Sequence, residues 1–226
     1  MSAVTPCAYE VRAVHLDAGR KYFSASWIHR LLERMAALDL NELQLHVSDN
    51  EGYRVASAAH PEVVSPEHLS RKDLAGLVEA AGELGVRLVP ALDVPGHLGA
   101  VLAHHPRLRA SQTQEGSRLL DYSRPEAVAL ALELIDELHE MVPSTAWCLG
   151  GDEAFDVTQE APLAERFPQL AAEAERRAGP APTSWTVTST SSVRWSRTWR
   201  AWGSRMCVPG MTPSTSLVPA RGCRRR

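Results

Sequence analysis

The stretch that decides the fold is residues 71–92, RKDLAGLVEAAGELGVRLVPAL, which joins a predicted helix to a predicted strand. Its first part carries apolar residues at helical spacing and closes at Gly85, a residue typical of the position just after a helix. The apolar run VRLVPAL follows at once and has the length of a buried strand. A helix, a short turn and a buried strand form the repeating unit of a parallel sheet covered by helices.

The same alternation continues on both sides of this stretch. The predicted strands are EVRAVHL (10–16), NELQLHV (41–47), VRLVPAL (86–92) and TAWCLG (145–150), and the predicted helices span 26–38, 71–84 and 125–141. The last helix begins at a proline, which is favoured in the first turn. Four such units in about 150 residues indicate an α/β fold, either half of an eight-fold barrel or one doubly wound sheet.

Composition narrows the class of protein. The 226 residues carry a net charge of -3 and are 44% hydrophobic, so neither nucleic acid nor an anionic membrane is favoured as a partner. Four cysteines without metal-type spacing indicate reduced thiols. The N-terminus lacks the basic start and apolar core of a signal peptide. These features predict a cytoplasmic protein, and secretion only if an N-terminal segment is missing.

The C-terminal part of the chain differs from the rest. Residues 181–226 contain no Asp, Glu or Lys, but eight Arg, fifteen Ser or Thr and four of the six Trp. Three interpretations are a basic arm for nucleic acid, a disordered tail, and a shifted reading frame. Back-translation of MCVPGMT (206–212) one frame over permits Val-Arg-Pro-Trp-Asn-Asp, a plausible strand end. We therefore predict a folded domain over 1–179 and an irregular, Arg/Ser/Thr/Trp-rich tail over 180–226 that is a frameshift product.

Polar side chains follow each predicted strand, where the sites of parallel α/β proteins assemble. They are Arg12, Asp17 and Arg20 around the first strand, His46, Asp49, Glu51 and Arg54 at the second, Asp93 and His97 at the third, and Asp152 and Glu153 at the fourth.

Each cluster also has a structural interpretation. Asp17 and Arg20 could form an ion pair at the strand–helix junction, His46 could be a core histidine, and His97 could cap the next helix. The pair at 104–105 is predicted to lie solvated at a helix end. A metal held by His15, His46, His97 and Asp93 lacks any recognised ligand spacing.

The adjacent carboxylates Asp152 and Glu153 restrict the mechanism. Successive side chains of an extended strand point to opposite faces, so the two acids cannot easily flank one glycosidic bond as a nucleophile and acid pair. Gly150 and Gly151 before them would allow the backbone to bend and a substrate to approach closely.

Four motifs in order, RAVHLDAGRKYF, LNELQLHVSDNEGYR, LVPALDVPGHLGA and LGGDEAF, resemble glycoside hydrolase family 20, the β-N-acetylhexosaminidases. The resemblance covers about residues 10–156 and implies a (β/α)8 barrel, of which this chain holds roughly the first four units. It also implies a substrate-assisted retaining mechanism on terminal non-reducing N-acetyl-β-D-hexosamine residues of oligosaccharides or glycans, as in chitin degradation. No metal or organic cofactor is implied.

The resemblance also implies roles for single residues. Glu153 matches the general acid/base, and Asp152 matches the residue that holds the substrate's acetamido group, which replaces an enzyme nucleophile. His97 matches a histidine that tunes the acid, and Arg12 matches an arginine that binds sugar hydroxyls. His46 and Asp49 match supporting positions.

The second half of such a barrel is absent from this reading frame, so turnover by the chain as written is a separate question. The alternatives are an inactive remnant or carbohydrate-binding fragment and, less favoured, a metal-dependent barrel hydrolase.

Overall fold

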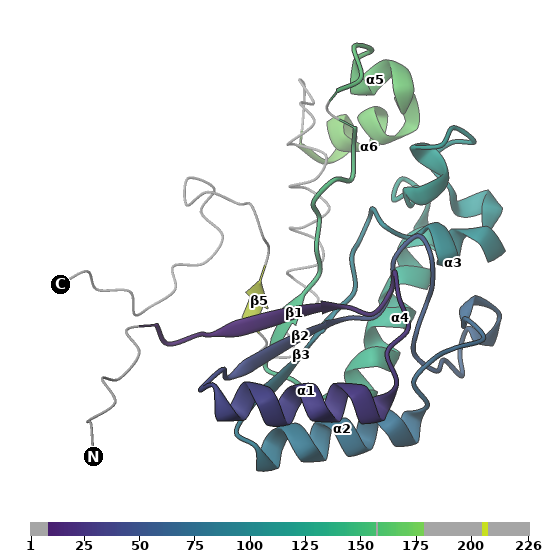
Figure 1. The fold of residues 1–226 in the computed structure, drawn as a ribbon. Coiled ribbons are helices and arrows are strands. Elements are labelled where there is room, and N and C mark those ends of the chain that lie inside the picture. The colour runs from purple at the N-terminus through teal and green to yellow at the C-terminus, as the bar shows by residue number, and fades with distance from the viewer. Residues whose placement is uncertain (1–8, 157, 179–204, 208–226) are drawn as a thin grey trace.

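The computed structural model describes residues 9–156, 158–178 and 205–207 (Figure 1). Its centre is a parallel sheet in the order β1-β2-β3-β4-β5, so each strand lies beside the next one along the chain. The strands are β1 (Ala13–Asp17), β2 (Glu42–His46), β3 (Arg87–Ala91), β4 (Ala146–Cys148) and β5 (Arg205–Cys207). All four predicted strands are therefore confirmed. The predicted tail over residues 180–226 lies outside the described residues except for β5, and its irregular character stays a prediction.

The three predicted helices are also confirmed, as α1 (Ala25–Ala37), α2 (Arg71–Glu83) and α4 (Pro125–Met141). Local sequence explains their ends. Ser70 and Asp73 form a reciprocal capping box at the start of α2, and Gly85 follows its end with φ of 68°. The helices α3 (Gly99–His104), α5 (Leu163–Arg166) and α6 (Pro168–Ala178) were not delimited from the sequence. The described residues also form 3₁₀-helices: η1 (Pro61–Val63) between β2 and α2, and η2 (Pro106–Leu108) and η3 (Gly116–Arg118) between α3 and α4.

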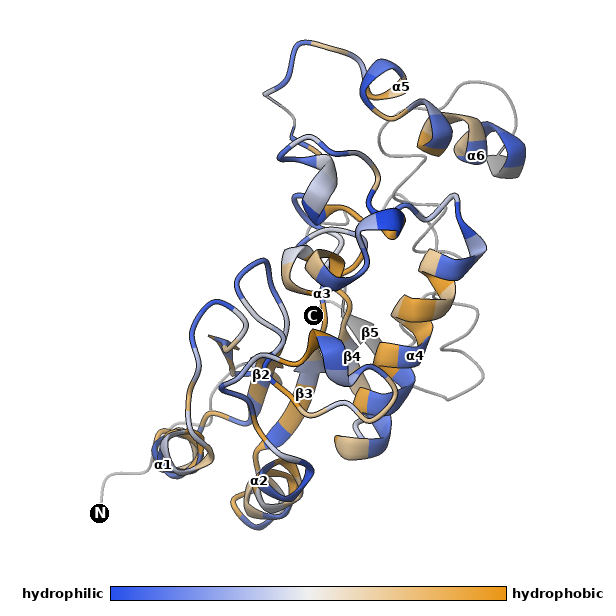
Figure 2. Ribbon diagram, turned by 90° about the vertical axis from the view of Figure 1, so that its right-hand side faces the viewer, coloured by the Kyte–Doolittle hydropathy of each residue, from blue (hydrophilic) through white to orange (hydrophobic). Residues whose placement is uncertain are grey.

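The main core lies between the sheet and helices α1, α2 and α4, which cover one face of it (Figure 1). Ile28, Leu32 and Met35 of α1 are buried, as are Leu134 and Leu138 of α4. Apolar residues are concentrated on β2, β3 and α4, whereas the loops beyond the strands are largely polar (Figure 2). This distribution fits a sheet whose outer face packs on helices and whose loops carry a site.

The two faces of the sheet differ. Residues such as Leu16, Leu43 and Leu45 are buried against helices, whereas His15 of β1 is exposed and Gln44 of β2 is half-buried. β1 is therefore buried only where it faces the helices, because its alternate side chains point to the other side of the sheet. None of the described helices is long and apolar enough to cross a bilayer.

A smaller apolar cluster supports the loops beyond β3 and β4. Phe167, Leu170 and Ala174 of the α5–α6 segment pack with Tyr122, Val128 and Ala154. Ala154 directly follows the paired acids, so this cluster fixes one end of the segment that carries them.

Candidate active site

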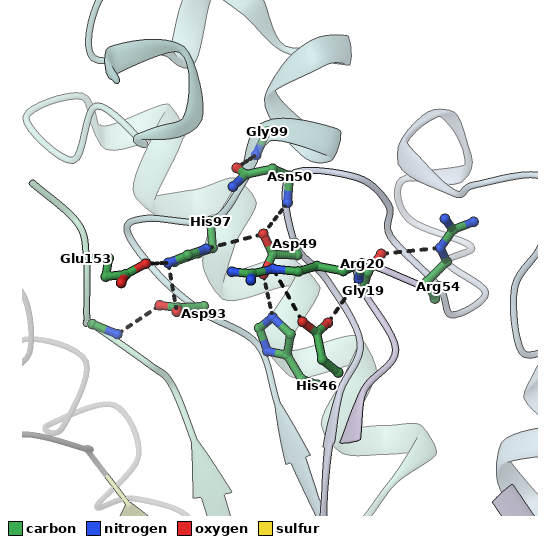
Figure 3. A network of polar contacts seen from close by, with 12 residues as sticks. Gly19, Arg20, His46, Asp49, Asn50, Arg54, Asp93, His97, Gly99 and Glu153 are labelled. Atoms are coloured by element: carbon green, nitrogen blue, oxygen red, sulfur yellow. Dashed lines mark hydrogen bonds and ion pairs between the residues drawn. The ribbon is translucent and has the colours of Figure 1, made fainter. Parts of the chain in front are cut away.

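The candidate active site lies at the carboxyl edge of the sheet, where the loops after β1 to β4 converge (Figure 3). A cavity of about 340 Å³ opens there. It is lined from all four strand ends, by Asp17, Arg20, His46, Asp49, Asp93, His97, Asp152 and Glu153 among others. The register places Asp17 beside His46, His46 beside Ala91, and Ala91 beside Cys148, so these strand ends form one layer.

Asp49 is the buried centre of this network (Figure 3). Its Oδ2 accepts a hydrogen bond from Arg20 Nε at 3.1 Å and lies 3.1 Å from His46 Nε2. Its Oδ1 accepts from the backbone N–H of Asn50 at 2.6 Å and lies 3.2 Å from His97 Nδ1. Burial alone would raise the pKa of Asp49, but the hydrogen bonds from His46, His97 and Asn50 hold it far below its usual range. Asp49 is thus an ionised carboxylate that orients an arginine and two histidines.

The backbone at Asp49 is approached closely from the neighbouring loop. A Cβ on Gly19 would lie 2.7 Å from the backbone nitrogen of Asp49, which leaves no room for a side chain there. The loop after β1 can therefore lie directly against the loop after β2, and Arg20 reaches Asp49 for this reason.

His97 connects Asp49 to the paired acids. Its Nε2 lies 3.5 Å from Glu153 Oε2 and 4.0 Å from Asp93 Oδ2. The hydrogen bond to Asp49 outweighs burial and, with the negative charges of Asp93, Asp49 and Asp152, raises the pKa of His97 to about 9. At neutral pH the ring is therefore an imidazolium that faces Glu153.

Asp93 holds the turn that precedes the acids. Its Oδ1 accepts a hydrogen bond from the backbone N–H of Gly151 at 2.8 Å. A Cβ on Gly150 would lie 2.0 Å from the same oxygen, so only glycine fits at that position. Burial, followed by the negative charge of Asp152, raises the pKa of Asp93 to about 7. The hydrogen bond from Gly151 opposes this shift. A largely neutral Asp93 therefore remains beside charged His97 in mildly acidic solution.

The shape of this turn contradicts the expectation from the sequence that Asp152 and Glu153 point to opposite faces of a strand. β4 ends at Cys148, and Gly150, Gly151 and Glu153 have φ of 59°, 93° and 47°. Because the backbone here is not extended, Asp152 and Glu153 do not alternate across a sheet, and both line the same cavity.

A second cavity of about 800 Å³ adjoins the first and shares His97 and Glu153 with it. Its further lining includes Asn50, Phe155 and Arg166. Glu153 therefore lies at the boundary between the two cavities.

Comparison with known proteins identifies the family. Residues 9–176 match the catalytic domain of glycosyl hydrolase family 20. The chain belongs to glycoside hydrolase family 20. Among curated proteins, Beta-hexosaminidase A of Caenorhabditis elegans is 30% identical over 163 residues, which is 67% of this chain and 29% of that protein. The Beta-N-acetylhexosaminidase of Cellulomonas fimi is 25% identical over 204 residues, covering 82% of this chain and 41% of that protein.

Solved structures of this family confirm the fold. The Flavobacterium johnsoniae chitobiase superposes with a TM-score of 0.77 at 25% identity, over 88% of this chain and 31% of that one. The beta-N-acetylhexosaminidase from Bacteroides fragilis gives 0.74 at 22% identity, over 88% and 40%. These neighbours are TIM barrels, and the chain spans less than half of each, so the predicted partial barrel is confirmed.

Among the predicted site residues of this family 20 chain, Arg12 lies elsewhere. It precedes β1 at the amino edge of the sheet, where Nη2 pairs with Asp39 Oδ1 at 3.0 Å and Nη1 donates to the Tyr9 carbonyl at 2.8 Å. Arg12 does not line the cavity, because β1 begins only at Ala13 and the cavity lies at the other end of the strand, so its role in binding sugar hydroxyls stays a prediction.

The arginine in the cavity of the family 20 domain is Arg20. Its predicted ion pair with Asp17 is present at 3.3 Å, but the same Nε also bonds Asp49, and the side chain is 55% exposed at the cavity. The sequence could have indicated Arg20 as a cavity residue, because it lies three residues beyond the end of β1 and sites lie at the carboxyl ends of strands.

Two groups in the family 20 cavity have metal-compatible spacing, Asp17–His46–Asp49 and Asp93–His97–Asp152. In the first, the guanidinium of Arg20 already lies against both carboxylates. In the second, His97 has a pKa of about 9 and would have to lose a proton to ligate. Neither group fits a resident metal well at neutral pH.

Proposed function

We propose that this chain carries the sugar-cleaving site of a β-N-acetylhexosaminidase, which removes terminal non-reducing N-acetyl-β-D-hexosamine from oligosaccharides or glycans. The observation that carries the proposal is the placement of Asp152 and Glu153 on one bent turn, in one cavity, with Glu153 at the boundary to a second cavity. The family match and the curated relatives named beta-hexosaminidase support the same substrate class.

In this proposal Glu153 protonates the glycosidic oxygen and later removes a proton from the attacking water. The imidazolium of His97, 3.5 Å from Glu153 Oε2, orients the carboxyl group between the two cavities. Asp49 keeps the ring of His97 in place through its other nitrogen, at 3.2 Å. Proton transfer at Glu153 is thus supported by a carboxylate–imidazolium pair beneath it.

Asp152 has a different target in this scheme. It lies in the sugar cavity within reach of Asp93 and His97, where it would accept a hydrogen bond from the acetamido N–H of the substrate. The acetamido oxygen then attacks the anomeric carbon, so the sugar supplies the nucleophile and the configuration is retained.

Arg20 is the best placed residue for the sugar hydroxyls. Asp17 and Asp49 hold its Nε, and the half-exposed guanidinium faces the cavity. A planar guanidinium fixed in this way can bind neighbouring hydroxyl groups without first losing side-chain freedom.

A second candidate function is sugar binding without turnover. The side chain of Glu153 is 76% exposed, and within the described part of the chain the inner face of β1 is open at His15. Electrostatic interactions are weaker around an acid that is so accessible to water than around one in a pocket that excludes water.

The test uses release of p-nitrophenol from its N-acetyl-β-D-glucosaminide. We expect turnover that falls at least about a hundredfold in Glu153→Gln, and that stays unchanged in Glu160→Gln, an exposed acid seven residues away. The matched glucoside, which lacks the acetamido group, should not be cleaved. Retention of N-acetylglucosamine without release of p-nitrophenol would support the binding function, and equal loss in both variants would refute the assignment of Glu153.

A further inference from the structure

A second cluster of histidine and carboxylate side chains lies outside both cavities of the active site. His60 precedes η1, Glu62 lies within it, and His105 stands between α3 and η2. One donor atom from each residue lies within 4.8 Å of the other two. We refer to these three residues as the His60–Glu62–His105 cluster.

The distances within this cluster match the edges of a metal coordination shell. Oε1 of Glu62 lies 3.4 Å from Nδ1 of His60 and 3.0 Å from Nε2 of His105. Donors that surround zinc tetrahedrally at about 2.0–2.1 Å lie roughly 3.3 Å from one another. The carboxylate oxygen is therefore already placed at the spacing that a shared ion requires from two imidazole nitrogens.

The hydrogen bonding of His60 leaves Nδ1, the ring nitrogen nearer to Glu62, available to bind an ion. Its Nε2 lies 2.8 Å from Oε2 of Glu133 on α4, so this nitrogen donates its proton to a carboxylate. With the proton on Nε2, Nδ1 carries a lone pair and faces Glu62 Oε1 at 3.4 Å, a contact that is a hydrogen bond only when Nδ1 is protonated. Metal-binding histidines are commonly held by an outer carboxylate in this way.

His105 provides the second signal. Its Nε2 is buried and, among the described residues, has no hydrogen-bond partner, although Glu62 Oε1 is only 3.0 Å away. The contact is short but not angled as a hydrogen bond, which fits two atoms directed at a common third position. The rings of His60 and His105 are nearly perpendicular, with centroids 6.0 Å apart.

The chemistry of the three donor groups indicates which class of ion they would bind. Two neutral imidazoles and one carboxylate suit a borderline divalent ion such as zinc better than magnesium or calcium, which prefer oxygen ligands.

We propose that His60, Glu62 and His105 bind a zinc-class divalent ion, with water in the fourth position, as a structural clamp. The ion would join the loop after β2 to the α3–η2 segment and, through Glu133, to α4. The loop after β2 also carries Asp49, so the clamp would brace the wall of the active site without contacting the substrate.

The test is zinc binding by the full chain after removal of metal with a chelator. Calorimetry should show one zinc per chain outside the active site, and zinc at about a hundredfold over Kd should raise Tm by about 5 °C or more. Magnesium should do neither. His105→Gln should weaken zinc binding at least tenfold, and the matched variant His104→Gln, at an exposed neighbour, should leave it unchanged.

Glu62→Gln provides a second variant, because this side chain is 42% exposed and its loss should not prevent folding. It should also weaken zinc binding at least tenfold, and cobalt bound to the wild type should give the intense visible absorption of a tetrahedral site. Absence of zinc binding to the wild type would overturn the proposal. Equal effects of His104→Gln and His105→Gln, or loss of zinc in Asp93→Asn with none in Glu62→Gln, would also overturn it.

Discussion

The two edges of the sheet contain the same kinds of ion pair and differ in how their charges are balanced. At the amino edge, Arg12 pairs with Asp39, and Arg87 pairs with Glu42. Each cation there meets one carboxylate. At the carboxyl edge, one arginine and three histidines share a cavity with five acids: Asp17, Asp49, Asp93, Asp152 and Glu153. At the amino edge the paired charges neutralise one another. At the carboxyl edge the excess of carboxylates around a cavity shifts pKa values and leaves acids available for chemistry.

The largest expected effect comes from removing the buried centre of the carboxyl edge. Asp49→Ala leaves Arg20 and two histidines without their shared carboxylate, and should lower the free energy of unfolding by about 3 kcal/mol or more. Denaturant unfolding measures this loss, and an imidazole NMR titration should show the pKa of His97 falling from its raised value.

The control lies at the amino edge. Asp39 is 76% exposed, so Asp39→Ala should cost less than about 1 kcal/mol. Equal losses in the two variants would contradict the contrast between the edges.

The next effect isolates the contact between Asp93 and the turn. Gly150→Ala forces a left-handed residue, at about 1–3 kcal/mol, and also pushes a methyl group into Asp93. Gly85 has a similar φ of 68° and open space around it, so Gly85→Ala measures the backbone cost alone. Thermal unfolding should show the larger loss for Gly150→Ala, and turnover should fall only in that variant. Equal losses of stability would show that the Asp93 side chain moves away from the added methyl group without an energetic cost.

A different kind of effect is the dependence of stability on pH that Asp93 creates. Its pKa is about 7 in the folded protein and near 4 when unfolded, so the folded state holds more protons between these values. Stability from this group is complete below about pH 4 and declines as pH rises to about 7, by up to about 1.4 kcal/mol per pH unit. His97, raised to about 9, continues the decline above its unfolded pKa near 6.5.

In Asp93→Asn the side chain keeps a similar shape and is neutral at all pH values. The variant should therefore show a smaller decline in the free energy of unfolding between about pH 4 and 7. Unfolding free energies measured from pH 4 to 9 test this expectation. A wild type whose stability rises from pH 4 to 7 would contradict the assignment.

The smallest effect is expected from Arg12. Arg12→Met removes an ion pair with an exposed partner at the amino edge and should change KM less than about twofold. Arg20→Met, the matched change in the cavity, should raise KM at least about tenfold, because its guanidinium faces the cavity proposed to bind the substrate. Steady-state kinetics or sugar binding by calorimetry compares the two. A larger effect of Arg12→Met than of Arg20→Met would support the predicted role of Arg12 in binding sugar hydroxyls.

The sequence predicted the alternation of strands and helices because apolar periodicity is local information. It also placed His46, Asp49, Asp93, His97, Asp152 and Glu153 at one edge, where the structure brings them together. It did not show that Arg12 lies at the amino edge, because periodicity does not show where β1 begins, and a shift of a few residues moves a side chain from one edge to the other. It predicted a solvated His105 because the partner, Glu62, is 43 residues away in the chain.

The distances in sequence across the site also bear on how the protein folds. Arg20 and Asp49 are 29 residues apart, Asp49 and His97 are 48 apart, and Asp93 and Gly151 are 58 apart. Such contacts close large loops, and their entropic cost is met only once the units between them have packed. We therefore expect helical signals to develop before these contacts during refolding. The raised pKa of His97 would serve as an internal reporter of the last stage, because it depends on side chains from three separate strand ends.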